Sequence, residues 1–402
     1  MIRELENLRI GITDPLLFKS SEAYKRAKNL ALSSHRDVEN ICSSGVRTLD
    51  LDAEGRYLLS GCSDGSIYIH DIYNFTGSPS FTANSVQVID RNHKFAHKYS
   101  TECVQWYPQD SGLFVTGSMD KSLKVWDSNR MRPVETVRFV GRIFQVHMSS
   151  KASSKCLVAV AGTESIVRLV DLTTGSCTHE LRGHERAVLT CRWSPCDEFL
   201  LTTGGCDGRI IVWDARSGKS ALRVLNHNNG QVTYKNKSKL KSQEVAVNGL
   251  CFTENGQNLI SLGWDGRGKL WNMTSGKKEE VEFKAKPSEK SKSVQFDVAG
   301  SSRKELVFIP SDGTILVYEV QTGELVKTLR GHYNEVNSCK FNTMYQELYS
   351  GAHDRNILIW TPDLLQEAAY KDHVNLQSAT TSSSTRPLCA VTQDVWSSDE
   401  EY

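Results

Sequence analysis

The residues of this sequence that most suggest chemistry are a histidine, a hydroxyl residue and an aspartate that recur at similar spacing. Between residues 183 and 216 they are His184, Thr203 and Asp207, followed by Trp213. Enzymes and metal sites both use a histidine beside a carboxylate. The same residue types occur in two other stretches, as His97, Thr116, Asp120 and Trp126, and as His332, Ser350, Asp354 and Trp360. This recurrence argues against catalysis or metal binding and favours a structural role.

The stretch 183–216 also contains the elements that must position these side chains. Residues 188–193, 199–203 and 209–213 are short runs of β-branched and aromatic residues separated by turn residues, which is typical of antiparallel strands. We predict that the four side chains form one buried hydrogen-bonded chain joining a loop, a turn and a strand. Charge-assisted links of this kind contribute about 1.5 to 3 kcal/mol each when they are satisfied.

The opening Gly183-His184 and the closing Trp213-Asp214, about 30 residues apart, resemble one blade of the WD-repeat family. The resemblance implies an all-β fold, a seven-bladed β-propeller over residues 42–362. Blade one lacks the histidine, and blade five has Gln243 in its place. Blades three and six depend on strand pattern more than on the motif, so their boundaries are less defined.

Two segments flank the predicted propeller. Residues 1–41 predict a helix-loop-helix, with Ile2, Leu5 and Leu8 at helical spacing before Gly11, and a second helix that starts at Asp14-Pro15 and runs to residue 32. Its apolar stripe either lies against the propeller or is offered to a partner. Residues 363–402, rich in serine, threonine and acids, predict a disordered tail in which Ser397 and Ser398 are candidate phosphorylation sites.

Composition excludes several classes of protein. With 48 basic and 47 acidic residues, the net charge of +1 gives no global attraction to nucleic acid or membranes. The eleven cysteines contain no Cys-x-x-Cys pair and predict reduced intracellular thiols, and residues 1–30 contain no continuous hydrophobic segment. We expect solvated Lys-rich loops at 226–244 and 277–292, or weak contacts there with nucleic acid or an acidic partner. No catalytic motif is present, so no enzyme activity, cofactor, metal or small-molecule substrate is expected.

Surfaces therefore remain as the functional candidates. In a propeller, the loops entering the innermost strands and the turns carrying the motif aspartate share one face. The side chains predicted to be displayed there, as a client face, are Glu102, Met119, Lys121, Trp264, Tyr333 and His353. Exposed aromatic residues and methionine suit protein binding, although ordinary packing at the rim is an equal alternative for any one of them. On the other face, Arg216 either binds a partner or forms a local salt bridge.

A more specific resemblance comes from Trp213-Asp214-Ala215-Arg216, preceded by an Ile/Val strand and Asp207. It resembles the box of propellers that recruit clients to cullin-RING ubiquitin ligases through the large damage-specific DNA-binding adaptor. With the N-terminal helices, it makes essentially the whole chain resemble the Cockayne syndrome A family. The other segments that carry this resemblance are VQWYP at 104–108, KSLKVWD at 121–127, VNGLCF at 247–252, QELYSG at 346–351, RNILIW at 355–360 and the terminal DVWSSDEE.

This resemblance implies a nuclear substrate receptor in transcription-coupled nucleotide-excision repair, beside the Cockayne syndrome B ATPase and stalled RNA polymerase II. The residues implied to bind the adaptor are Ile2, Leu5, Leu8, Pro15, Leu16, Leu17, Phe18 and Arg216. Clients are implied to bind the opposite face. A scaffold without a ligase connection and a direct binder of damaged DNA are the alternatives, and the near-neutral charge argues that direct nucleic-acid contact is at most weak.

Overall fold

The computed structural model describes residues 9–11, 14–39, 42–73, 81–151, 156–216, 221–225, 242–243, 245–286, 293–300 and 304–363. The chain divides into two units, residues 1–362 and 363–402, and the second lies outside the described part except for Asp363. Several predictions fall on other residues. They concern the first helix with Ile2, Leu5 and Leu8, the tail with Ser397 and Ser398, and the lysines of 226–241 and 287–292.

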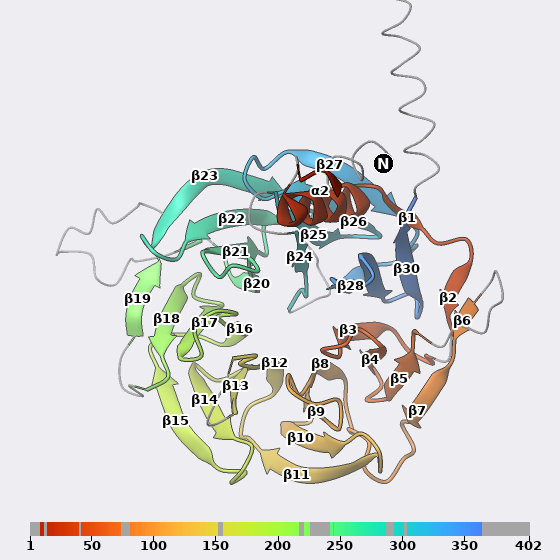
Figure 1. Cartoon of the computed structure of the whole chain (residues 1–402). Helices are drawn as coiled ribbons and strands as arrows, with labels where there is room; N and C mark the ends of the chain where they lie inside the picture. The colour runs from red at the N-terminus through yellow and green to blue at the C-terminus, as the bar shows by residue number, and fades with distance from the viewer. Residues whose placement is uncertain are drawn as a thin grey trace, which may run out of the picture. The chain divides into compact units, whose positions relative to one another are not determined.

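Seven four-stranded antiparallel sheets surround a channel in the first unit, which confirms the predicted seven-bladed propeller (Figure 1). Blade one, from the channel outward, contains β3 (Val46–Leu51), β4 (Tyr57–Cys62), β5 (Ile67–Asp71) and β7 (Ser85–Ile89). The next three blades contain β8 (Thr101–Trp106), β9 (Leu113–Ser118), β10 (Ser122–Asp127) and β11 (Arg132–Arg138); β12 (Ile143–Met148), β13 (Leu157–Gly162), β14 (Ile166–Asp171) and β15 (Cys177–Arg182); and β16 (Val188–Trp193), β17 (Leu200–Gly205), β18 (Ile210–Asp214) and β19 (Ala221–Leu225).

The last three blades complete the ring, and the seventh is built from both ends of the unit. They contain β20 (Val247–Phe252), β21 (Asn258–Gly263), β22 (Arg267–Asn272) and β23 (Lys277–Lys284); β24 (Asp297–Ala299), β25 (Leu306–Ser311), β26 (Thr314–Glu319) and β27 (Leu325–Arg330); and β28 (Val336–Asn342), β29 (Glu347–Ala352), β30 (Ile357–Pro362) and β1 (Leu30–Leu32). A short parallel pair, β2 (Arg36–Val38) with β6 (Phe81–Ala83), lies outside these sheets.

The hydrophobic core lies between neighbouring blades. The indole rings of Trp126, Trp213, Trp271 and Trp360 are fully buried there. The blades approach closely because small residues occupy their second strands. A Cβ atom added to Gly204 in β17 would lie 2.7 Å from the Val247 side chain in β20 of the next blade. Close packing of this kind makes the ring rigid.

Helix α2 (Pro15–Lys28) has the predicted beginning but ends earlier than the sequence suggested. The Asp14 side chain accepts a hydrogen bond of 2.9 Å from the Leu16 backbone N–H, and Pro15 is the first helical residue. Instead of extending the helix to residue 32, the chain forms β1, where Leu30 pairs with Pro362 and is fully buried. The structure therefore differs from the predicted domain boundary at residues 41 and 42, because β1 belongs to blade seven.

The Lys-rich stretch 277–292 is also partly different from its prediction as a loop. Its first half forms β23, the outer strand of blade five, and places Phe283 in the core with no exposed surface. The charged residues face solvent, and Lys278 and Glu282 form an ion pair of 2.7 Å. The many lysines made the alternation of inward-facing and outward-facing side chains along this strand hard to recognise in the sequence. One large aromatic side chain on the inward face is sufficient to anchor an edge strand.

Candidate partner-binding surfaces

The side chains that suggested chemistry in blade four form one buried chain of hydrogen bonds. The Trp213 indole N–H donates to the Thr203 hydroxyl at 2.8 Å, and that hydroxyl lies 2.8 Å from Nε2 of His184. The other ring nitrogen of His184 lies 3.1 Å from the Asp207 carboxylate. The chain thus joins the third strand, the second strand, the loop before the first strand and the turn, as the sequence predicted.

Blades two and seven contain the same arrangement. Nδ1 of His97 lies 2.8 Å from Asp120 and its Nε2 lies 2.7 Å from Thr116. Burial lowers the pKa of His97, so its ring is neutral at pH 7, with Nδ1–H donating to the carboxylate and Nε2 accepting from the hydroxyl. In blade seven, His332 lies 2.8 Å from both Asp354 and Ser350. Because internal partners occupy both ring nitrogens of each histidine, these sets stabilise the blades.

Blades one and five use substitutes at the same place. Gln243, the departure noted in the sequence, is buried and donates to the Ser261 hydroxyl at 2.9 Å, which also accepts from Trp271 at 2.9 Å. The amide therefore replaces the imidazole in the hydrogen bond to the second-strand hydroxyl. In blade one, the Ser43 hydroxyl donates to Asp64 at 2.5 Å.

The predicted client face is defined by the loops before the innermost strands and by the turns after the second strands. The antiparallel registers bring these segments to one side, where Val188 pairs with Gly205 and Thr101 with Ser118. We call this side the turn face. Trp264 and Tyr333 are 42% and 79% exposed on it, and Lys121 is also exposed.

The other predicted client-face residues are less exposed to a partner. Met119 and His353 are half-buried. Glu102 is a correction, because its side chain is only 3% exposed and forms an ion pair of 2.6 Å with Arg47 of blade one. A glutamate at the start of an innermost strand points into the channel, where a neighbouring blade can neutralise it. It therefore joins two blades and is not displayed to a partner.

An apolar cluster occupies part of the mouth of the channel on the turn face. Phe144, Leu189 and Ala246 are its buried members. Met119, Ala187 and Cys206 are partly buried against them, and the Trp264 backbone N–H donates to the Ala246 carbonyl at 3.0 Å. We call the partly exposed residues Met119, Ala187, Cys206 and Trp264 the apolar arc.

The opposite side, which we call the helix face, carries the turns between first and second strands and helix α2. The Lys304 ammonium, in such a turn of blade six, lies 5.3 Å from the ring centre of Tyr24 in α2. Ala27 at the end of the helix is buried in the ring, whereas Leu16 and Leu17 near its beginning are 75% and 44% exposed. Among the residues implied to bind the adaptor, Pro15 is also exposed and Phe18 is half-buried.

Arg216 also lies on the helix face, and the local salt bridge that the sequence allowed is present. Its Nε and Nη2 donate to the Asp214 carboxylate at 3.0 and 2.8 Å, which raises the pKa of Arg216 and lowers that of Asp214. The guanidinium carbon lies 4.8 Å from the ring centre of Phe199. The Arg216 side chain is 65% exposed, so it presents an ordered cation to solvent.

A polar girdle that sequence reasoning missed surrounds the channel. In four blades, the penultimate residue of the innermost strand bonds to the backbone of the next blade; these residues are Asp50, Gln105, His147 and Arg192. In blade six, Asp297, the first residue of β24, makes the corresponding bond to the backbone of blade seven. In blade seven, Lys340 lies 3.4 Å from Asp50 and 3.7 Å from Asp297 and so links three blades. Aligning the polar residues at this strand position would have revealed the girdle.

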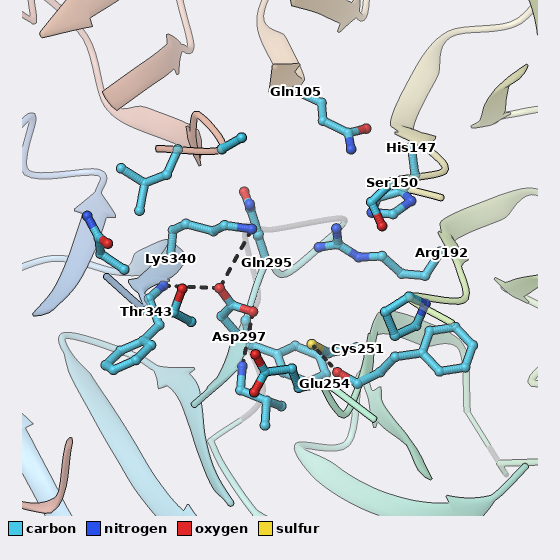
Figure 2. Close-up of a pocket in the computed structure, with 18 of the residues that line it drawn as sticks. Gln105, His147, Ser150, Arg192, Cys251, Glu254, Gln295, Asp297, Lys340 and Thr343 are labelled. Atoms are coloured by element: carbon cyan, nitrogen blue, oxygen red, sulfur yellow. Dashed lines mark hydrogen bonds and ion pairs between the residues drawn. The ribbon is translucent and has the colours of Figure 1, made fainter. Parts of the chain in front are cut away.

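A cavity of about 360 Å³ opens where the girdle meets the helix face (Figure 2). Arg192, Lys340, Asp297 and Glu254 line it. Because cations and carboxylates alternate and Lys340 already compensates two aspartates, the cavity has no dominant charge for a ligand. Its described side chains mainly connect the blades.

The described part of the chain contains no group of three or more histidine, cysteine or acidic side chains placed to hold a metal ion. The described cysteines are free thiols. No described helix combines the length and apolarity needed to span a membrane.

Comparisons with known proteins add to this geometry. The WD domain, G-beta repeat family matches residues 32–71, 90–127, 175–214, 234–272 and 323–361. WD repeat-containing protein ATCSA-1 of Arabidopsis thaliana is 33% identical over 87% of this chain and 94% of its own length. Radiation-sensitive protein 28 of Saccharomyces cerevisiae is 24% identical over 68% of the chain and 60% of its own length. Serine-threonine kinase receptor-associated protein of Dictyostelium discoideum is 23% identical over 80% of the chain and 97% of its own length.

Proposed function

We propose that this chain, which belongs to the WD-repeat protein family, is a non-catalytic substrate receptor of a cullin-RING ubiquitin ligase. Its role would be that of the Cockayne syndrome A protein in transcription-coupled nucleotide-excision repair, in the nucleus. The similarity to ATCSA-1 along most of both chains supports this role. The name of the yeast relative, radiation-sensitive protein 28, connects that protein with sensitivity to radiation.

The observation that carries the proposal is the division of α2 into a packed end and an exposed end. Ala27 and Leu30 fix the end of this segment in the ring, while Leu16 and Leu17 project from its beginning with large exposed fractions. Exposed leucines on an anchored helix suit insertion into an apolar groove of a partner. The partner proposed is the large damage-specific DNA-binding adaptor of the ligase. The Arg216 and Phe199 pair would add a second contact on the same face.

The turn face would then hold the client, away from the adaptor. Trp264, Tyr333 and Lys121 are its exposed members from the predicted set. The Cockayne syndrome B ATPase and the stalled RNA polymerase II machinery are the proposed partners on this side. Holding a client near the ubiquitin-loading machinery makes transfer effectively intramolecular, so the receptor needs no catalytic group of its own.

Replacing both exposed leucines by aspartate, Leu16→Asp with Leu17→Asp, is expected to weaken adaptor binding by about 100-fold or more, because a buried charge in an apolar groove has no partner. The measurement is titration of the purified full chain with the purified adaptor. Leu222→Asp is the matched control, since this leucine of outer strand β19 is 58% exposed. Adaptor affinity that is unchanged in the double variant would instead support a scaffold without a ligase connection.

A further inference from the structure

The exposed charges on the turn face are strongly unbalanced. Six cationic side chains on its loops, turns and strand ends form no ion pair with any described residue: Lys98, Lys121, Arg142, Arg186, Arg267 and Arg355. All six are exposed and they belong to five different blades, so the positive charge is distributed around the channel mouth. Lys98 and Lys121 both belong to blade two.

Most acidic groups on the same face are either buried or paired. The side chains of Asp120, Asp207 and Asp354 are at most 10% exposed and accept hydrogen bonds from the blade histidines. Glu102 pairs with Arg47, and Glu185 with Arg209 at 2.7 Å. Asp312 lies 3.7 Å from Lys286, and the half-buried Asp64 accepts hydrogen bonds from serine hydroxyls. This leaves Asp90 and Asp265 as exposed carboxylates without an ion pair within the described ranges. The free exposed charge of this face is therefore mainly positive, although the whole chain is nearly neutral.

The cations lie beside the apolar arc. Lys121 follows Met119 by two residues in one turn, Arg186 precedes Ala187, and Arg267 is three residues after Trp264. The arc contains the exposed indole of Trp264 and the half-buried thioether of Met119, next to a fully apolar cluster. An aromatic or aliphatic side chain bound there would be desolvated, while charged groups beside it would reach the surrounding cations.

We infer that the turn face binds an acidic peptide segment with a central aromatic or aliphatic anchor, carried by another protein. This inference rests on the proposed function, because it specifies the chemistry of the client segment. The anchor packs on the apolar arc, and flanking aspartates, glutamates or phosphoserines pair with the rim of lysines and arginines. A basic segment is rejected by the same rim through like-charge repulsion.

The arc favours a peptide over a nucleic acid. Phosphate groups of a duplex would satisfy the cations, but a duplex has no side chain to bury against Met119 and Trp264. The cations also form a rim around a centre. The backbone phosphates of a nucleic acid require a stripe of cations along one direction instead.

The test is fluorescence anisotropy of the full chain with a labelled peptide in which glutamates flank a central Trp-Leu pair. We expect binding that weakens as salt concentration rises, and at least about tenfold weaker binding for Arg142→Glu with Arg186→Glu. Trp264→Ala is expected to weaken binding to a similar extent with little change in the salt dependence. Peptides with glutamine for glutamate, or glycine for the Trp-Leu pair, should bind at least about tenfold more weakly.

The control for charge is Arg132→Glu with Lys277→Glu, which makes the same change in net charge on exposed outer-strand residues. Equal loss of binding in this control and in the rim variant would overturn the inference, as would equal binding of the glutamine peptide. Tighter binding of duplex DNA than of the acidic peptide, with loss in the rim variant, would assign the face to nucleic acid. Titration with the adaptor is unaffected by the rim variant if the two faces are independent, so failure of the peptide test leaves the ligase proposal testable on its own.

Discussion

Leu30→Ala is expected to lower the free energy of unfolding by about 3 kcal/mol, as for other fully buried leucines. Leu30 has no exposed surface, and the strand that contains it closes the ring by pairing with β30 of blade seven. Removal of its side chain therefore leaves a cavity where the N-terminal segment joins the last blade of the propeller. Equilibrium denaturation of the full chain measures the effect.

Leu32→Ala is the matched control for this variant. Leu32 lies on the same strand and pairs with Trp360, but it is 47% exposed. We expect its replacement to change the free energy of unfolding by less than about 0.5 to 1 kcal/mol. Equal effects at the two positions would show that β1 does not contribute to the core of blade seven.

Asp354→Asn is expected to lower the free energy of unfolding at pH 7 by about 3 kcal/mol, because it disrupts a buried charge-assisted hydrogen bond. Asp354 and His332 have side chains that are 0% and 1% exposed and lie 2.8 Å apart. Asp312→Asn is the control, since Asp312 occupies the equivalent turn position in blade six but is 61% exposed. Its replacement should have little effect.

The dependence on pH distinguishes loss of the charge from a general packing defect. Burial by itself raises the pKa of Asp354, but the hydrogen bond and charge of His332 outweigh it and lower the pKa. A carboxyl group whose pKa is lowered by folding adds stability above its unfolded pKa of about 3.9, and this stability is lost as the pH falls further. The difference between Asp354→Asn and the original chain should therefore shrink between pH 5 and pH 3. A constant difference over this range would contradict the assigned role.

The sequence was most informative where one pattern is repeated. The sets around His97, His184 and His332 fixed the spacing of the strands, because each joins a loop, a turn and a strand whose distance along the chain hardly varies. Gln243 was assigned to the same place by position alone, and its amide does bond to Ser261.

Features that depend on contacts between distant segments were not predictable in the same way. Residues 30–32 continue the helical pattern locally, and only the unpaired edge of β30 makes them a strand. Glu102 was expected to face a partner because it lies near the entrance of an innermost strand, and the Arg47 that pairs with it is 55 residues away along the chain. The girdle was also missed, since each member is a single polar residue whose hydrogen-bond or ion-pair partner lies in another repeat.

The central claim is that one rigid ring presents two independent surfaces, the helix face for the ligase adaptor and the turn face for a client. Hydrogen–deuterium exchange of the full chain, with and without the adaptor, tests it most directly. The account predicts slower exchange in α2 and in the turns around Phe199 and Arg216, with no change around Lys121, Trp264 and Tyr333. Protection of these turn-face segments by the adaptor, with α2 unchanged, would contradict it.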